Sequence, residues 1–227
     1  MQNDVLQIGQ YEITTIVTGG KWKENCYLVK HIHTGEMVLL DPGDDDDVIS
    51  DIINSQNGIL TMILLTHAHH DHIGAAGQLC QSFDVMSYLS KRDARLLRQA
   101  PLYAARFAGR TILVPDQIEL YEDIESIPFG NSQISVIATA GHTLGSVCYS
   151  FGDFVFTGDT LLYEHVGRTD LPGGNEQEIL EAVHNLLEIS VDQCFIFSGH
   201  GRRWTIAKAK EWWQKYQIQP PKYNRFE

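Results

Sequence analysis

The sequence predicts one layered domain of the α/β (or α+β) class. Strand-like and helix-like stretches are mixed in both halves of the 227 residues. Apolar strand-like runs, such as Leu60–Leu65, end abruptly in glycine, histidine and aspartate. No internal repeat, low-complexity tract or proline-rich linker divides the chain. Because mixed strands and helices pack as sheets covered by helices, we expect a single domain over residues 1–227.

The first eighty residues predict four strands and two helices. β-Branched and aromatic runs separated by glycine-bearing turns predict three strands: Tyr11–Val17, Cys26–His31 and Met37–Leu40. The acids Asp44–Asp47 favour a helix start that continues through Ile53. The continuous apolar run at Leu60–Leu65 is typical of a strand buried on both faces, and a helix is expected after it through Gln81.

The rest of the chain continues the same alternation. We expect a short strand at Phe83–Tyr88, a helix at Lys91–Gln99 and irregular backbone over residues 100–116. Four further strands are predicted: Ile134–Thr139, Val147–Phe151, Phe154–Thr157 and Cys194–Phe197. Apolar spacing within Glu176–Ile189 predicts an amphipathic helix, and a last helix is expected at about Thr205–Tyr216.

Composition narrows the function classes. Lys and Arg total 17 against 29 Asp and Glu, a net charge of -12, which disfavours a nucleic-acid partner. No apolar stretch has the length of a bilayer span, and the start of the chain lacks a signal-peptide pattern. The four cysteines have no CxxC spacing, as expected of free thiols in a reducing compartment. We therefore expect a cytoplasmic protein, monomeric or homodimeric, without membrane or nucleic-acid partners.

Metal-ligand residues follow the ends of four apolar strands. The segments read LTMILLTHAHHDH, ISVIATAGHT, DFVFTGDT and QCFIFSGHG. If these ends share one edge of the structure, seven side chains converge: His67, His69, Asp71, His72, His142, Asp159 and His200. Imidazole and carboxylate ligands without thiolate suit zinc, iron or manganese. Seven groups exceed the needs of one catalytic zinc and fit two divalent ions, of which zinc is the first expectation.

The same motifs resemble the metallo-β-lactamase-fold hydrolases. The matching segments, in chain order, are Asp41-Pro42-Gly43, His67–His72, Gly141-His142-Thr143, Thr157–Thr160 and Gly199-His200. The resemblance covers essentially the whole chain and implies a four-layer αββα sandwich of two mixed β-sheets flanked by helices.

The resemblance also implies a ligand set. One ion would be held by His67, His69 and His142, the other by Asp71, His72 and His200, with Asp159 bridging both. Asp41 resembles the aspartate that orients ligand side chains, and it is equally well explained as a turn-forming residue before proline.

The segment Gly167–Gly174 (GRTDLPGG) resembles the small glyoxalase II-like branch, which hydrolyses hydroxyacyl-glutathione thioesters. The implied activity is cleavage of a thioester or ester by a metal-bound hydroxide. Because 27 residues follow His200, we do not expect a counterpart of the helical C-terminal domain that grips glutathione in full-length glyoxalase II. A mononuclear iron persulfide dioxygenase, which shares GRTD, is the main alternative. A lactonase or phosphodiesterase with the same two-ion centre is a further one.

Charge counting predicts the substrate class. Two divalent ions, less Asp71, Asp159 and one hydroxide, leave about one positive charge, which favours a small anionic substrate. Asp71 and Asp159 are thus the catalytic candidates. Arg168 could bind a substrate carboxylate or pin its own loop, and Trp22 could belong to a substrate lid or to an ordinary surface loop.

Overall fold

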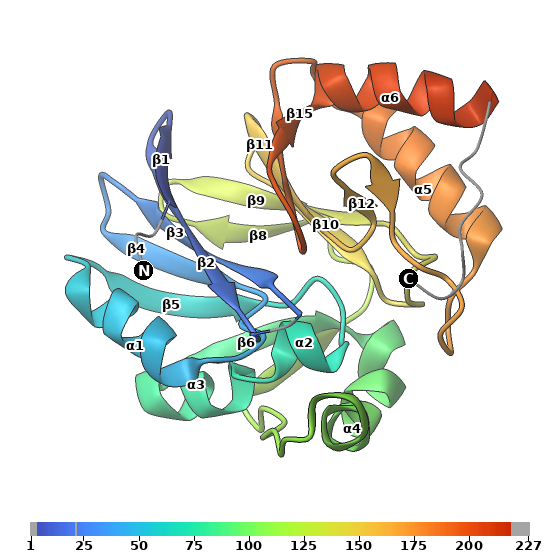
Figure 1. The fold of residues 1–227 in the computed structure, drawn as a ribbon. Coiled ribbons are helices and arrows are strands. Elements are labelled where there is room, and N and C mark those ends of the chain that lie inside the picture. Colours follow the sequence, from blue (N-terminus) through green and yellow to red (C-terminus); the bar gives the residue numbers. More distant parts are fainter. Residues whose placement is uncertain (1–3, 21, 219–227) are drawn as a thin grey trace.

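Two mixed β-sheets pack face to face, and helices cover the outer face of each (Figure 1). The computed structural model describes residues 4–20 and 22–218. The four-layer αββα sandwich implied by the resemblance is therefore confirmed.

The first sheet has seven strands arranged in chain order. They are β1 (Asp4–Ile8), β2 (Tyr11–Thr18), β3 (Glu24–His31), β4 (Glu36–Leu40), β5 (Ile59–Leu64), β6 (Met86–Ser90) and β7 (Ile118–Tyr121). Pairing is antiparallel from β1 to β4 and parallel from β4 to β7. The carboxyl ends of β4 and β5 consequently lie side by side.

The second sheet has six strands in the order β15-β14-β11-β10-β9-β8. They are β8 (Ser126–Phe129), β9 (Ser132–Ala138), β10 (Val147–Ser150), β11 (Phe154–Gly158), β14 (Phe195–Ser198) and β15 (Trp204–Thr205). Only the β11–β14 pair among them is parallel, so the carboxyl ends of these two strands also meet. A small separate ribbon joins β12 (Leu161–Leu162) to β13 (His165–Val166).

The helices divide between the two outer faces (Figure 1). The first sheet carries α1 (Asp46–Ser55), α3 (Ala76–Phe83) and α4 (Ala94–Tyr103), whereas α5 (Glu176–Ile189) and α6 (Ile206–Ile218) lie on the second. Three short elements complete the set: α2 (His70–Ile73), the 3₁₀ turn η1 (Lys91–Asp93) and the π-helix η2 (Ala104–Ala108).

Alternation along the strands separates three apolar layers. In β3, Cys26 and Leu28 face the helices, while Tyr27 and Val29 face the second sheet. In β11, Phe156 joins the layer between the sheets and Val155 joins the layer beneath α5 and α6. Because successive side chains of a strand point to opposite faces, a strand covered on both sides must be apolar at nearly every position.

The element predictions hold for most of the chain. Glu176–Ile189 is helical over its full predicted length, and Asn175 caps it by accepting hydrogen bonds from the amides of Gln177 and Glu178. The predicted strand at Phe83–Tyr88 is misplaced. Phe83 ends α3, Asp84 adopts the left-handed conformation that stops a helix, and β6 begins at Met86.

Two other differences concern short elements. Residues 100–116 are not wholly irregular, because α4 continues through Tyr103 and η2 follows it. The strands β1, β7 and β8 were not predicted. Each has only four or five residues and exposes much of its surface, so its pattern is too weak to distinguish from a loop.

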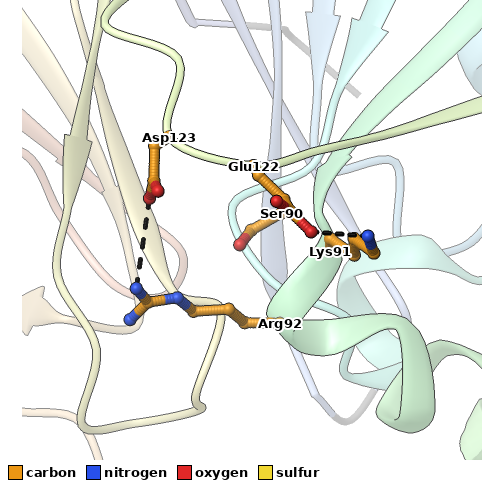
Figure 2. A pocket seen from close by; sticks show the side chains of 5 residues that line it. All are labelled: Ser90, Lys91, Arg92, Glu122 and Asp123. Carbon is orange, nitrogen blue, oxygen red and sulfur yellow. Dashed lines mark hydrogen bonds and ion pairs between the residues drawn. The ribbon is translucent and has the colours of Figure 1, made fainter.

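Within the described ranges, no helix is long and apolar enough to cross a membrane. A polar hollow at the end of β6 is lined by Ser90, Lys91, Arg92, Glu122 and Asp123 (Figure 2). Ion pairs of 2.5 Å (Lys91 with Glu122) and 4.0 Å (Arg92 with Asp123) span it, and none of the seven candidate ligands lines it.

Candidate metal centre

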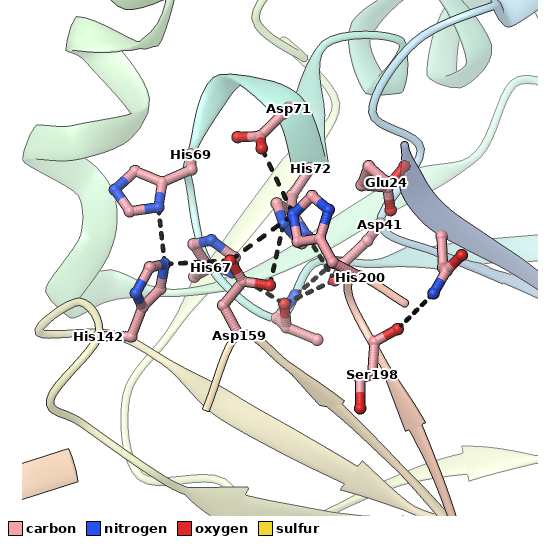
Figure 3. Close-up of polar contacts among 12 residues, drawn as sticks. Glu24, Asp41, His67, His69, Asp71, His72, His142, Asp159, Ser198 and His200 are labelled. Carbon is pink, nitrogen blue, oxygen red and sulfur yellow. Dashed lines mark hydrogen bonds and ion pairs between the residues drawn. The ribbon is translucent and has the colours of Figure 1, made fainter. Parts of the chain in front are cut away.

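The candidate ligands lie just beyond the ends of strands from both sheets (Figure 3). His67 follows β5 in the first sheet, and His142, Asp159 and His200 follow β9, β11 and β14 in the second. Backbone hydrogen bonds join the two sheets at this edge, including the one from the Val147 amide to the Thr66 carbonyl at 3.0 Å. The fold thus brings together all seven residues that the sequence singled out.

His67, His69 and His142 form the first group. One nitrogen of each ring lies within 4.8 Å of the nitrogens of the other two. The closest pair is His69 Nδ1 and His142 Nε2, 2.9 Å apart. His67 and His142 are buried, and His69 lies at the partly exposed side of the group. Three imidazoles at this spacing could hold one divalent ion.

Asp71, His72 and His200 form the second group, with the same mutual spacing of ligand atoms. His200 Nε2 lies 3.6 Å from Asp71 Oδ2. His72 is fully buried, whereas Asp71 and His200 are partly exposed. The group combines the ligand types that suit a second divalent ion.

Asp159 lies between the two groups. Its Oδ2 is 3.6 Å from His142 Nε2 in the first group and 3.7 Å from His200 Nε2 in the second. Its Oδ1 is 3.4 Å from His72 Nε2. This carboxylate is therefore placed to contribute to both groups.

Hydrogen bonds on the outer side of the rings set their orientation. The Nδ1 atoms of His142 and His200 contact the backbone carbonyls of Arg168 (2.7 Å) and Trp22 (3.1 Å). His72 Nδ1 contacts Asp41 Oδ2 at 3.1 Å. Because carbonyl and carboxylate oxygens only accept, each Nδ1 must carry the hydrogen. In the neutral ring the lone pair is then on Nε2, which faces the cluster, as metal ligation requires.

Unpartnered buried atoms provide a direct test of the fit to a cation. His67 Nε2, His72 Nε2 and Asp159 Oδ1 are all buried, and none has a hydrogen-bond partner within the described residues. Buried polar atoms are normally hydrogen-bonded. All three lie in the cluster and can donate electron pairs, so the residues present fit divalent metal ions.

Burial and neighbouring charges shift the pKa values of the cluster. Burial, reinforced by His142, lowers the pKa of His69 to about 3, and burial lowers that of His67 well below its usual value. Both rings are neutral at pH 7 and ready to ligate. Burial also opposes the charge of His72, but Asp159 and Asp41 outweigh it and raise that pKa. Metal binding to the second group must therefore displace a proton.

Asp41 both turns the chain and orients a ligand. Its φ of 47° is left-handed, and its backbone amide donates to Leu64. Oδ1 accepts from the Thr66 amide at 2.7 Å, and Oδ2 accepts from the Thr66 hydroxyl at 2.6 Å and from His72. The Thr66 hydroxyl in turn lies 3.0 Å from His67 Nδ1. These contacts are compatible with both explanations that the sequence left open for Asp41.

The side chain of Arg168 does not face the cluster as a free cation. Its Nε and Nη2 donate to the two oxygens of Asp170 at 2.7 and 2.8 Å, which pins the loop. Its contribution to the cluster is the backbone carbonyl that accepts from His142. Gly167 permits this approach, since a Cβ there would lie 1.8 Å from the Asp159 carbonyl oxygen. The GRTD motif thus acts on the site through its backbone.

Sequence reasoning missed two buried acids beside the cluster. Asp93 is 2% exposed and accepts from the Ala68 amide, the Thr143 hydroxyl and the Gly145 amide. Glu24 is fully buried, and among the described residues its Oε2 has a partner, the Thr18 hydroxyl at 2.7 Å, whereas its Oε1 has none. Burial raises the pKa of Glu24 well above its usual value. No local pattern marks either residue.

A sandwich that gathers histidine and aspartate at one edge between its sheets defines a class, the metal-binding hydrolases. Residues 19–197 match the metallo-beta-lactamase superfamily, and the chain belongs to this family. Members of the superfamily bind divalent metals, typically two.

Individual relatives agree with this assignment. The hydroxyacylglutathione hydrolase GloC of Haemophilus influenzae is 30% identical over 83% of this chain and 91% of its own. The crystal structure of BLEG-1, a B3 metallo-beta-lactamase, superposes with a TM-score of 0.80 and 31% identity over 88% of this chain and 96% of that one. The crystal structure of TTHA1623 in a di-iron-bound form superposes with a TM-score of 0.75 and 33% identity, over 85% of this chain and 94% of that one.

Proposed function

We propose that the protein hydrolyses a thioester or ester of a small anionic substrate at a centre of two divalent ions. The observation that carries the proposal is the position of Asp159, whose carboxylate lies within 3.7 Å of histidines from both ligand groups. A shared carboxylate between two groups is the arrangement of two-metal hydrolases. The similarity to GloC and the GRTDLPGG segment favour a thioester over other acyl substrates.

Each side chain has a defined task in this proposal. His67, His69 and His142 would hold one ion, Asp71, His72 and His200 the other, and Asp159 would contact both. Bound ions of this kind supply the acidity that ionises water near neutral pH and polarises a carbonyl. Asp41 holds His72 in place by accepting its Nδ1 hydrogen, and the Arg168 carbonyl does the same for His142.

Asp71 Oδ2 and Asp159 Oδ2 are the carboxylate atoms close to His200 Nε2. Both carboxyl groups have pKa values below their usual range, because neighbouring histidines outweigh the effect of burial. They remain ionised at pH 7, so either can accept a hydrogen bond from a water molecule in the centre and orient it toward the carbonyl carbon. No serine or cysteine nucleophile is needed.

The test measures metal content and activity on one preparation. Elemental analysis of the purified protein should give two ions per chain, zinc being the first expectation and iron the second, as in the di-iron form of TTHA1623. The same sample should hydrolyse hydroxyacyl thioesters, lose this activity with a chelator and regain it when the metal is restored. A single iron with oxygen consumption on persulfides would instead establish the dioxygenase alternative, and a lactone or phosphodiester preference would replace the thioester assignment.

A further inference from the structure

A row of four aromatic rings runs from the candidate metal centre to the protein surface. Trp22 and His70 meet edge to face with ring centroids 5.6 Å apart. His70 stacks on Phe107 at 6.4 Å with the planes 20° apart, and Phe107 stacks on Tyr103 at 6.0 Å with the planes 7° apart. We refer to Trp22, His70, Phe107 and Tyr103 as the aromatic row.

The inner end of the row is fixed to both ligand groups. His70 stands in the chain between His69 of the first group and Asp71 of the second. The backbone carbonyl of Trp22 accepts from His200 Nδ1 at 3.1 Å. A substrate whose reacting carbonyl lies at the centre would therefore have these rings beside it.

The chain segment that carries Phe107 is anchored by an arginine and contains a π-helix. Arg110 Nη2 donates to the Gly43 carbonyl at 2.7 Å, and Arg110 forms an ion pair with Asp44. This ties the segment after α4 to the loop that follows Asp41. Phe107 lies in the π-helix η2, and π-helical turns, which occur mostly as single turns, are frequent at functional sites.

Exposure varies along the row: His70 is buried, Trp22 is partly exposed, Phe107 is open to solvent, and Tyr103 packs partly buried against the apolar layer of the first sheet. His70 is 7% exposed, whereas Phe107 is 47% exposed and the neighbouring Leu102 is 70% exposed. Covering this exposed apolar surface with an apolar group of the substrate is favourable, because it removes apolar area from water next to the ligand cluster.

We infer that the aromatic row binds the acyl part of the substrate and selects apolar, preferably aromatic, acyl groups. This inference rests on the proposed hydrolysis of thioesters or esters and adds the class of acyl group. Phe107 is the specificity-determining residue, because it is the ring of the row with the largest exposed surface on a segment that carries no candidate ligand.

The experiment compares two acyl groups in the wild type and in Phe107→Ala. The first readout is kcat/KM for acetyl and phenylacetyl thioesters of the same thiol. The second is the affinity of the metal-loaded protein for acetate and phenylacetate, measured by calorimetry without any turnover. We expect the wild type to prefer the phenylacetyl compound in both, and Phe107→Ala to reduce that preference about fivefold, because the phenylacetyl values fall more than the acetyl values.

Ile189→Ala provides the matched control, because it removes a 65% exposed apolar side chain at the far end of α5. Its preference should equal that of the wild type. Equal preference in the wild type and in Phe107→Ala would overturn the inference. Selective binding of phenylacetate without hydrolysis of any thioester would refute the proposed function alone. Hydrolysis without selection between the two acyl groups would refute only the role proposed for the aromatic row.

Discussion

The carboxylate of Asp93 accepts a hydrogen bond from the hydroxyl of Thr143, 50 residues away, at 2.8 Å. The same carboxylate accepts from the Ala68 amide at 3.0 Å and from the Gly145 amide at 2.8 Å. Ala68 stands between two candidate ligands, His67 and His69, and Thr143 follows a third, His142. One buried side chain thus holds together the two loops that form the first ligand group.

Replacing Asp93 with alanine should weaken both the fold and the first ligand group. Three buried donors lose their acceptor, so we expect the free energy of unfolding to fall by about 3 kcal/mol. Residues that orient ligands commonly change metal affinity by about 10–100-fold, and we expect a loss of that size. Urea unfolding and metal titration would measure the two effects.

Asp123→Ala is the matched control for Asp93, because it removes an aspartate from an exposed position across the hollow in Figure 2. Its 4.0 Å pair with Arg92 is solvent-exposed, so stability and metal affinity should not change. If Asp93→Ala bound metal as tightly as this control, the Asp93 hydrogen bonds would have no role in shaping the centre.

Asp41→Asn should weaken metal binding at the second group with little change in the first. Asparagine tolerates the left-handed backbone at this position, but its amide nitrogen cannot accept. If the amide nitrogen replaces Oδ1, the contact to the Thr66 amide is lost, and if it replaces Oδ2, the contacts to the Thr66 hydroxyl and to His72 are lost. We expect one ion to bind about 10–100-fold more weakly in a metal titration. Equal weakening of both ions would show that Asp41 acts on the whole centre.

The sequence was sufficient to predict the seven candidate ligands because each follows a recognisable buried strand. Carboxyl ends of neighbouring strands meet at one edge, so residues such as His67 and Asp159 could be placed together without coordinates. His70 lies in the same segment but is in neither ligand group, and its ring contacts Trp22 and Phe107.

The supporting residues could not be predicted, since their roles depend on contacts between distant segments. Asp93 lies in a 3₁₀ turn between a strand and a helix, where an aspartate is ordinarily a solvated cap. Glu24 is the first residue of the strand β3, and a charged residue at the start of a strand is ordinarily exposed to solvent. Arg168 and Trp22 were selected for their side chains, yet both contact the cluster through backbone carbonyls, which no residue type encodes.

Asp159→Ala and Asp71→Ala should differ in the number of ions they retain. Asp159 contacts histidines of both groups, so its removal should lower the occupancy of both and abolish activity. Asp71 belongs to the second group only, so Asp71→Ala should keep the ion held by the three histidines of the first. Elemental analysis after dialysis gives the counts. Full occupancy and unchanged turnover in Asp159→Ala would refute its bridging role.

Glu24→Gln should change how the stability of the metal-free protein depends on pH. In the folded protein burial raises the pKa of Glu24 well above 4.5, so the group stays protonated, whereas the unfolded chain releases the proton near that value. As pH rises above about 4.5, the unfolded state binds fewer protons than the folded state, and the free energy of unfolding falls by up to about 1.4 kcal/mol per pH unit.

The Glu24→Gln variant lacks this titration, so its stability relative to the wild type should rise as the pH increases above about 4.5. Near pH 4 the two proteins should be similarly stable, because the wild-type carboxyl is then neutral in both states. Urea unfolding in the presence of a chelator measures the difference. The exposed Glu188→Gln on α5 should give a flat difference over the same range. A flat difference for Glu24→Gln would show that the carboxyl titrates at the same pH in the folded and unfolded chains, so that burial does not raise its pKa.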